Sequence, residues 1–323
     1  MATLLVVTWW PLAPALPVSH PHPAASYDEA LNRFAGILAH QPGGLVPGCE
    51  PRLLTHGHRV GRAVVLLHGF TNCPEQFAAF GRRCYDDGDN VVLARLPEHG
   101  FANRRGPTLG RVTTGEIAEA TDAAVDLACG LGDTVVVAGL SVGGEAAAWA
   151  AQQRSDVGRA VIIAPLLGIA HVPPAVSRLL ARWWRWAPDR FQWWDPRVRD
   201  RLPGPPYCYW GWSTRGLGEM LQFGFALSAD AVARPPRATS VVLVTNAHDD
   251  AVDNGAIRAL ARAWAARAPG RVRAWEFADS LRLGHDVIDP EQPYQRLELV
   301  YPVLERLVQG DGGTPVTAGD RRP

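Results

Sequence analysis

The sequence contains no lysine. All 32 of its basic residues are arginines, and 32 acidic residues balance them, so the formal net charge is zero. The absence of lysine excludes a lysine nucleophile and Schiff-base chemistry. The balanced charge predicts no broad basic face, which argues against a nucleic-acid-binding protein.

Cysteine is scarce as well. The five cysteines are odd in number and widely spaced, and no two of them form a C-x-x-C pair. We therefore expect neither a zinc site nor a disulfide framework, and we interpret these residues as small buried hydrophobic side chains. They are Cys49, Cys73, Cys84, Cys129 and Cys208.

Long hydrophobic runs are absent too. None approaches the roughly 20 residues that cross a bilayer, so no transmembrane segment is expected. Residues 3–16 are apolar, but no basic residue precedes them, and Pro11 and Pro14 interrupt them. A secretory signal has a basic start and an unbroken apolar stretch. We expect a cytoplasmic protein, with a secreted protein as the alternative.

The chain does contain material for a large core, with 47% hydrophobic and 20% charged residues. Six short apolar runs, rich in β-branched residues, alternate with segments of helical periodicity. The runs span 63–67, 90–94, 134–138, 160–164, 240–244 and 272–277, and helices are predicted at 27–40, 75–85, 116–129, 142–154, 256–267 and 296–308. Continuous apolar runs indicate strands covered on both faces. Their alternation with helices predicts an α/β fold with a mostly parallel sheet.

The fourth and fifth runs are separated by about 75 residues without a strand pattern, which hold seven of the 12 tryptophans. A structureless loop of this length is unusual, so we predict an inserted Trp-rich helical cap at 169–234. The core then comprises 60–168 and 235–310. An N-terminal extension with one helix, 1–59, precedes it, and a flexible tail, 311–323, follows it.

One cap segment has the periodicity of an amphipathic helix. Its apolar residues recur at i, i+3, i+4, i+7 and i+8, and its arginines fall opposite. The apolar residues are Val176, Leu179, Leu180, Trp183 and Trp184, and the arginines are Arg178, Arg182 and Arg185. Three interpretations stay open. The helix packs the cap on the core, forms a hydrophobic wall over a substrate pocket, or contacts a lipid surface.

The third run leads directly into a G-x-S-x-G motif, Gly139-Leu140-Ser141-Val142-Gly143. Between a strand and a helix, this motif predicts a sharp turn that exposes a nucleophilic serine above the sheet. Glycines are needed on both sides of the serine, where a Cβ would meet neighbouring backbone. Amides at the start of the next helix point to the place where negative charge develops. We predict Ser141 as the nucleophile.

The first run ends in His68-Gly69-Phe70-Thr71. In such sites one oxyanion donor is a backbone N–H just after this strand, and the other belongs to the residue that follows the nucleophile. We assign these donors to Phe70 and Val142. His68 is a candidate base, but inside this turn we expect it to pack under the oxyanion loop.

Three motifs together carry a resemblance to a known family: Leu66-Leu67-His68-Gly69-Phe70-Thr71, Leu96-Pro97-Glu98-His99-Gly100 and Gly139-Leu140-Ser141-Val142-Gly143-Gly144. Over residues 60–310, apart from much of the cap, the chain resembles the α/β-hydrolase superfamily. It is most similar to the carboxylesterase and monoacylglycerol-lipase-like branch. The resemblance implies the α/β-hydrolase fold and a triad in the order serine, acid, histidine. Glu98 departs from the pattern, because many relatives have glycine there.

The family order selects the base. His285 follows the sixth run, whereas His248 follows the fifth and precedes the candidate acids. Because the acid precedes the histidine in the family, we predict that His285 takes the proton of Ser141. His248 is the rival base.

Three aspartates after the fifth run compete for the role of the acid. Asp253 stands just before a helical segment and is placed to cap it. Asp249 lies three residues before Val252, and in relatives the acid precedes an aliphatic residue by about the same interval. We therefore predict that Asp249, with Asp250 as the alternative, orients the imidazole of His285.

These residues predict a serine hydrolase that cleaves apolar carboxylic esters through an acyl-enzyme and needs no metal or organic cofactor. We expect the pocket for a small-molecule ester beside Leu140 and Thr71, under cap aromatics such as Trp183 and Trp194. A thioesterase, a C–C hydrolase and a serine peptidase are the alternatives. A non-catalytic binding protein is disfavoured because all three triad residues are present.

Overall fold

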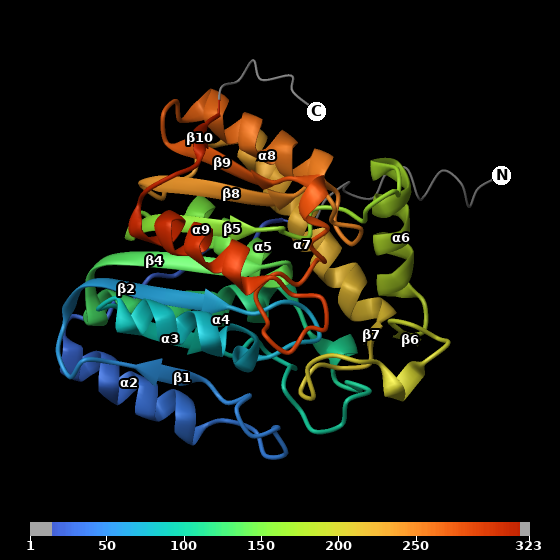
Figure 1. Ribbon diagram of the computed structural model, residues 1–323, viewed down its shortest axis with the longest axis horizontal. Coiled ribbons are helices and arrows are strands. Elements are labelled where there is room, and N and C mark those ends of the chain that lie inside the picture. The colour runs from blue at the N-terminus through green and yellow to red at the C-terminus, as the bar shows by residue number, and fades with distance from the viewer. Residues whose placement is uncertain (1–14, 317–323) are drawn as a thin grey trace.

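A sheet of eight strands in the order β1-β3-β2-β4-β5-β8-β9-β10 runs through the computed structural model, which describes residues 15–316 (Figure 1). Its six inner strands pair in parallel. They are β2 (Val60–Leu67), β3 (Asn90–Ala94), β4 (Gly132–Leu140), β5 (Val157–Ile163), β8 (Ser240–Asn246) and β9 (Val272–Phe277). Each overlaps one of the six predicted runs, and all five residues of β3 are buried, as in a strand covered on both faces. The predicted mostly parallel α/β sheet is confirmed.

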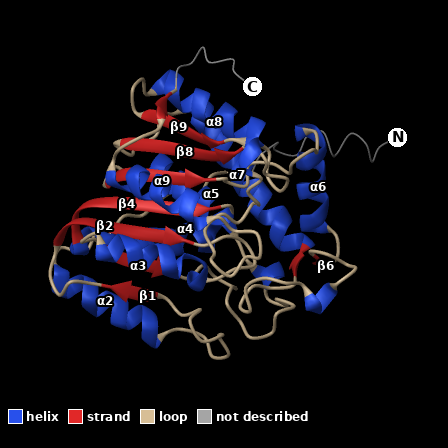
Figure 2. Cartoon of the chain, in the orientation of Figure 1, coloured by secondary structure: helices blue, strands red, loops and turns tan. Residues whose placement is uncertain are grey.

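Helices cover both faces of this sheet (Figure 2). On one face lie α3 (Ala78–Asp86) and α9 (Leu297–Gln309), where the rings of Phe80 and Tyr301 pack edge to face with centroids 5.3 Å apart. The other face carries α2 (Tyr27–Ala39), α4 (Thr114–Leu131), α5 (Val142–Gln153), α7 (Thr214–Ala233) and α8 (Asn254–Arg267). The two layers bury the sheet and leave its edges and strand ends for loops.

Two short strands extend the sheet at its edges. β1 (Arg52–Leu54) pairs antiparallel with β3, and β10 (Thr314–Pro315) pairs antiparallel with β9. The expectation of a flexible tail at 311–323 is therefore wrong for residues 314 and 315, while 317–323 lie outside the described residues. Two or three residues carry too little periodicity to predict a strand.

Only part of the predicted cap at 169–234 stands apart from the core. α7 packs against α5 and α8, so this helix belongs to the layer that covers the sheet. The protruding part consists of α6 (Pro174–Trp186) and the antiparallel pair β6 (Phe191–Trp193) and β7 (Gly211–Ser213). α6 in turn packs along α7.

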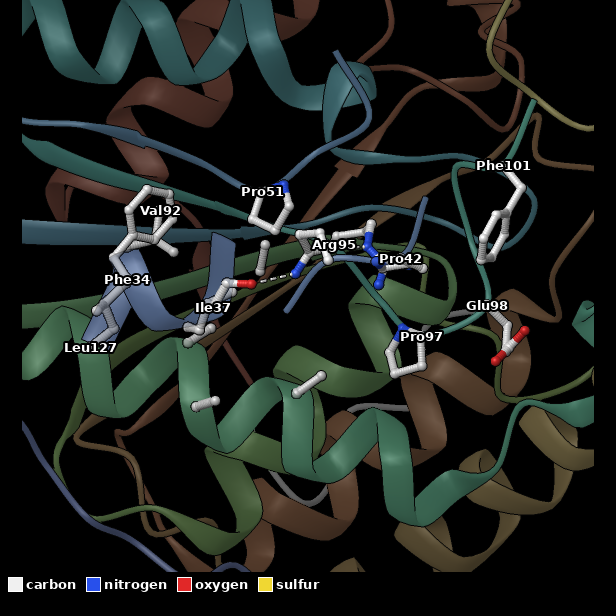
Figure 3. Close-up of a pocket in the computed structure, with 15 residues that line it drawn as sticks. Phe34, Ile37, Pro42, Pro51, Val92, Arg95, Pro97, Glu98, Phe101 and Leu127 are labelled. Carbon is white, nitrogen blue, oxygen red and sulfur yellow. Dashed lines mark hydrogen bonds between the residues drawn. The ribbon is translucent and has the colours of Figure 1, made fainter. Parts of the chain in front are cut away.

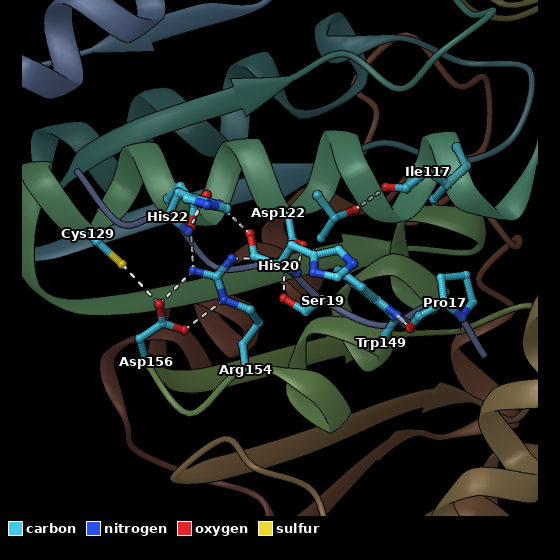
Figure 4. A network of polar contacts seen from close by, with 12 residues as sticks. Pro17, Ser19, His20, His22, Ile117, Asp122, Cys129, Trp149, Arg154 and Asp156 are labelled. Carbon is cyan, nitrogen blue, oxygen red and sulfur yellow. Dashed lines mark hydrogen bonds and ion pairs between the residues drawn. The ribbon is translucent and has the colours of Figure 1, made fainter.

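A buried arginine ties the N-terminal segment to the core (Figure 4). Arg154 follows α5 and pairs with three carboxylates at 2.8, 2.6 and 2.6 Å, those of Asp122, Asp126 and Asp156. Two of these carboxylates belong to α4 and also accept hydrogen bonds from residues 19–22. Because a buried charge requires such partners, the cluster holds α4, α5 and the N-terminal segment together.

No helix within residues 15–316 is both long enough and apolar enough to cross a bilayer. Most of the apolar N-terminal stretch at 3–16, which we considered as a signal peptide, lies outside the described residues.

Cys49 and Cys73 form a disulfide bond, with their Cα atoms 5.2 Å apart. The expectation that the cysteines are unpaired is therefore wrong for these two, whereas Cys84, Cys129 and Cys208 are free thiols. The spacing did not reveal the bond, because the partners lie 24 residues apart, one before β1 and one after β2.

We predict that the denatured, unreduced protein exposes three thiols to iodoacetamide and that reduction exposes all five. The double variant Cys49→Ser/Cys73→Ser should lose about 3 kcal/mol in the free energy of unfolding, because a crosslink over a loop of this length restricts the unfolded chain. Urea titration measures the loss. Five reactive thiols before reduction would contradict the disulfide.

Candidate active site

Ser141 occupies a strained turn between β4 and α5. Its φ of 60° and ψ of −116° are uncommon for a residue with a side chain. The turn is tight because neighbouring backbone presses on two glycines. A Cβ on Gly139 would overlap the carbonyl of Gly143, and one on Gly143 would overlap the carbonyl of Leu67 at the end of β2. The strand–turn–helix context that the G-x-S-x-G motif requires is present.

The two predicted oxyanion donors follow neighbouring strands. Phe70 comes after β2 and Val142 after β4, and in the paired strands Leu67 stands opposite Gly139. Within residues 15–316, neither amide donates a hydrogen bond to another residue. Val142 also opens α5, and the amides at a helix N-terminus favour negative charge. Both N–H groups are therefore available to an oxyanion.

His68 lies beneath this loop. It is fully buried, its Nε2 accepts a hydrogen bond from the Leu96 amide at 3.0 Å, and its Nδ1 lies 2.9 Å from the Gly69 carbonyl. Burial lowers the pKa of this imidazole well below its usual value. The ring of His99 packs edge-on against it, with centroids 5.1 Å apart. With both nitrogens occupied, His68 supports the loop, as expected.

The ends of β8 and β9 bring Asp249 and His285 together. Oδ2 of Asp249 lies 2.7 Å from Nδ1 of His285. The other oxygen, Oδ1, accepts hydrogen bonds from the amides of Ala251 and Val252 at 2.8 and 3.2 Å. Since its side chain is fully buried, the carboxylate is held from both oxygens and aimed at the ring.

This contact changes the protonation of both partners. Burial alone would raise the pKa of Asp249. The charge and hydrogen bond of His285, together with the hydrogen bonds from the Ala251 and Val252 amides, outweigh burial, so the pKa lies below its usual value. Burial lowers the pKa of His285, and the Asp249 carboxylate outweighs this effect and raises it. The carboxylate therefore stabilises a protonated ring.

Ser141 Oγ makes no hydrogen bond with the His285 ring within the described residues. Catalytic hydrogen bonds are often long without substrate and tighten when it binds. Ser141 and His285 nevertheless lie at the same edge of the sheet, because each follows the carboxyl end of a parallel strand.

The competing residues lie elsewhere. Asp250 is exposed, and Asp253 caps the start of α8, as predicted. His248 pairs with Asp279 at 2.9 Å on the surface. Of the three candidate aspartates, the structure brings Asp249 to the ring of His285.

A polar chain that the sequence analysis did not foresee connects the oxyanion loop with the loop of His285. The Gln76 side chain is buried. Its Oε1 accepts a hydrogen bond from the Gly69 amide, and its Nε2 donates one to Oδ2 of Asp286, each at 2.8 Å. Asp286 directly follows His285 and also accepts Nε2 of Gln292 at 3.0 Å. Gln76 therefore holds both loops with one side chain. A single glutamine in a short helical turn carries no sequence signal.

The cap is tied to the same loop. The Tyr207 hydroxyl donates to the Asp289 carboxylate, with each oxygen 2.8 Å away, and Tyr207 packs with the bonded Cys49 and Cys73. Burial and the nearby Asp286 carboxylate raise the pKa of Asp289 to about 7. The disulfide, the cap and the loop after the candidate base thus meet in one buried cluster.

The four predicted pocket residues divide into two groups. Leu140 and Thr71 are buried beside the elbow and the oxyanion loop. Trp183 and Trp194 are 66% and 46% exposed, so the burial expected of a pocket roof is absent. For Trp183 the reason is that α6 buries the smaller Ser177 and Ala181 instead. Trp194 lies outside this helix, with its ring centroid 6.3 Å from that of Trp212.

A cavity of about 310 Å³ lies between α2, β3 and α4 (Figure 3). Phe34, Val92 and Leu127 are among its apolar lining residues, and no predicted triad residue lines it. Glu98 stands at its edge with a φ of 64°, a left-handed conformation that costs a residue with a Cβ roughly 1–2 kcal/mol. Glycine adopts it freely, which accounts for glycine at this position in the resembled motif.

Residues 64–298 match the model of the alpha/beta hydrolase family. The chain belongs to this family. The match begins in β2 and ends in α9, so it includes the elbow and the loops that carry Asp249 and His285. No curated protein sequence matches the chain.

Solved structures of similar fold include lipolytic enzymes. A structure from work on the metagenome-derived lipolytic enzymes LipS and LipT aligns with a TM-score of 0.61 at 17% identity, covering 82% of this chain and 99% of the other. Paleococcus ferrophilus monoacylglycerol lipase aligns with a TM-score of 0.60 at 17% identity, covering 80% of this chain and 98% of the lipase. A soluble variant of Saccharomyces cerevisiae monoglyceride lipase aligns with a TM-score of 0.58 at 13% identity, covering 82% of this chain and 91% of the lipase. At these identities the similarity shows the fold.

Asp249→Asn should lower kcat for an ester by about 10⁴-fold, because the imidazole loses the partner that orients it. Asp250→Asn is the matched control and should have little effect. In the Asp249 variant the acid limb of the kcat/KM profile should move to lower pH, since the carboxylate raises the pKa of His285. Rates with p-nitrophenyl acetate, with circular dichroism of both variants, test this. A severe loss confined to Asp250→Asn would contradict the assignment.

Gln76→Leu should lower kcat about tenfold with little change in KM, because the loop that carries one predicted oxyanion donor loses its support. Gln292→Leu removes a hydrogen bond to the same Asp286 carboxylate and leaves Gly69 untouched, so its rate should stay near that of the original protein. Thermal unfolding of both variants separates rate from stability. Equal kcat losses in the two variants would contradict a role for the Gly69 contact.

Proposed function

We propose that this protein is a serine hydrolase that cleaves apolar carboxylic esters through an acyl-enzyme. The observation that carries the proposal is the 2.7 Å contact between Asp249 and His285, at the strand ends that also present Ser141. An oriented acid–histidine pair at the same sheet edge as a strained serine supports nucleophilic catalysis.

In the proposed reaction, Nε2 of His285 takes the proton of Ser141 Oγ as the oxygen attacks the ester carbonyl carbon. Asp249 holds Nδ1–H and stabilises the imidazolium. The negative charge on the carbonyl oxygen is met by the amides of Phe70 and Val142. His285 then gives its proton to the leaving alcohol, and a water molecule releases the acid by the same steps in reverse. No step requires a metal or an organic cofactor.

Two observations favour an apolar substrate. The similar solved structures are described as lipolytic enzymes and monoacylglycerol lipases, and the cap beside the site is rich in tryptophan. Both favour an apolar acyl or alcohol group. Because one fold hosts many reactions, turnover of a substrate panel tests this class.

Ser141→Ala should abolish ester hydrolysis, with a loss on the order of 10⁶ in kcat, as for removal of the nucleophile in other serine hydrolases. A panel of p-nitrophenyl esters of increasing acyl length, run beside acyl thioesters and aminoacyl amides, measures the reaction class. A fluorophosphonate should label Ser141 in the original protein and nothing in the variant. Turnover in the variant above a tenth of the original rate would overturn the assignment, and faster turnover of thioesters or amides would change the substrate class.

A further inference from the structure

The cavity between α2, β3 and α4 has an arginine in its wall. Arg95 directly follows β3 and is half-buried. Its Nε donates a hydrogen bond to Oε1 of Gln41 at 2.6 Å, and its Nη1 donates to the carbonyls of His99 and Leu96 at 3.1 and 3.5 Å. These acceptors are neutral. Within residues 15–316, Nη2 of Arg95 makes no hydrogen bond and the guanidinium forms no ion pair.

The charge of Arg95 is only partly compensated. Burial lowers the pKa of its guanidinium, and the acidic groups of Tyr209 and Glu98 offset only part of this effect. Glu98 lines the same cavity, but its carboxylate lies beyond Pro97 and away from Arg95 (Figure 3). The stretch 1–14, outside the described residues, has no acidic residue in its sequence. Because a cation withdrawn from water needs a partner of opposite charge, Arg95 favours an anion from outside the chain.

Apolar side chains gather on one side of this arginine. Phe34 of α2, Val92 of β3 and Leu127 of α4 line the cavity, and they lie together on the side of Arg95 opposite Glu98 (Figure 3). Apolar walls with a few placed polar groups are typical of sites that bind small molecules. The cavity therefore offers a cation for the head of a ligand and an apolar wall for its body.

The packing of α2 on α4 leaves this space open. The two helices touch at Gly130 of α4, where a Cβ would lie 2.5 Å from the Ser26 carbonyl and 2.9 Å from Cβ of Ala30. Toward the start of α4, by contrast, Ala120 and Ala124 line the cavity, and their short side chains leave room that α2 does not fill. The hollow is thus a result of the helix packing itself.

The volume and the charge together define the ligand. A cavity of about 310 Å³ holds about ten groups of the size of a water molecule, at roughly 30 Å³ each. A guanidinium binds a carboxylate through charge-assisted hydrogen bonds. We propose that this cavity binds a carboxylic acid with a short apolar chain, with the carboxylate on Nη2 of Arg95 and the chain against Phe34, Val92 and Leu127. No predicted triad residue lines the cavity, so the proposal does not depend on the proposed ester hydrolysis.

Isothermal titration calorimetry of the full chain with octanoate, a carboxylate of this size, tests the proposal. Acetate lacks the chain and octanol lacks the charge, so each should bind at least about tenfold more weakly than octanoate. Arg95→Gln removes the cation and should weaken octanoate binding roughly tenfold or more. Arg296→Gln is the matched control, because Arg296 is exposed and does not line the cavity.

A steric variant tests the same site without touching the arginine. Ala120→Leu places a larger side chain in the cavity and should prevent octanoate binding. Ala35→Leu adds the same atoms on α2 at an exposed position outside the cavity lining, so it should bind octanoate as the original protein does. Thermal unfolding of all four variants separates a loss of binding from a loss of folding.

The absence of saturable octanoate binding to the original protein overturns the proposal. Octanoate binding that survives in Ala120→Leu or in Arg95→Gln places the ligand elsewhere and also overturns it. A dimer that Ala120→Leu dissociates, seen by analytical ultracentrifugation without octanoate binding, assigns the cavity to a second copy of the chain and has the same consequence. Ser141→Ala should bind octanoate in this cavity as the original protein does, so a failure of this site and a failure of the proposed hydrolysis are distinguishable.

Discussion

The close approach of the elbow to the end of β2 is the constraint on which the candidate site depends. Gly143 lies against the Leu67 carbonyl, and Gly139 lies against Gly143, with no room for a Cβ at either glycine. This contact keeps Ser141 in its left-handed turn and starts α5 at Val142. It also sets the distance between the loops after β2 and β4. A larger residue at either glycine would displace Ser141 and move the two predicted oxyanion donors apart.

Features that depend on local pattern were predictable from the sequence. The six parallel strands are continuous apolar runs, and the elbow motif lies between a strand and a helix in the expected context. The pairing of Asp249 with His285 could be predicted because each residue follows a strand, and the carboxyl ends of parallel strands meet at one edge of the sheet. The three-residue interval to Val252 favoured Asp249 over Asp250 as the acid, and the structure gives this interval a physical reason. The Val252 amide binds back to the Asp249 carboxylate.

Features that depend on tertiary proximity were not predictable. Nothing in the local sequence of Cys49 indicates that it meets Cys73, and Gln76 acquires its position only when the loops of Gly69 and Asp286 come together. For α6, periodicity identifies an apolar stripe but not the direction in which it faces. That direction is decided by Gly218, on a different helix, which lets α7 approach the small residues of α6. A pattern in one segment cannot report the shape of the surface that it meets.

The arginine cluster at Arg154 has a mechanical consequence for the elbow. α5 begins at the strained turn and ends beside a buried cation that three carboxylates surround. A strained turn relaxes most easily when its helix slides or tilts, but such a motion here would pull Arg154 from its partners, which is costly in the protein interior. The indole of Trp149, also on α5, donates to the Pro17 carbonyl at 2.8 Å. The N-terminal segment thus restrains the helix that follows Ser141. Removal of residues 1–23 would free the end of that helix that lies away from Ser141.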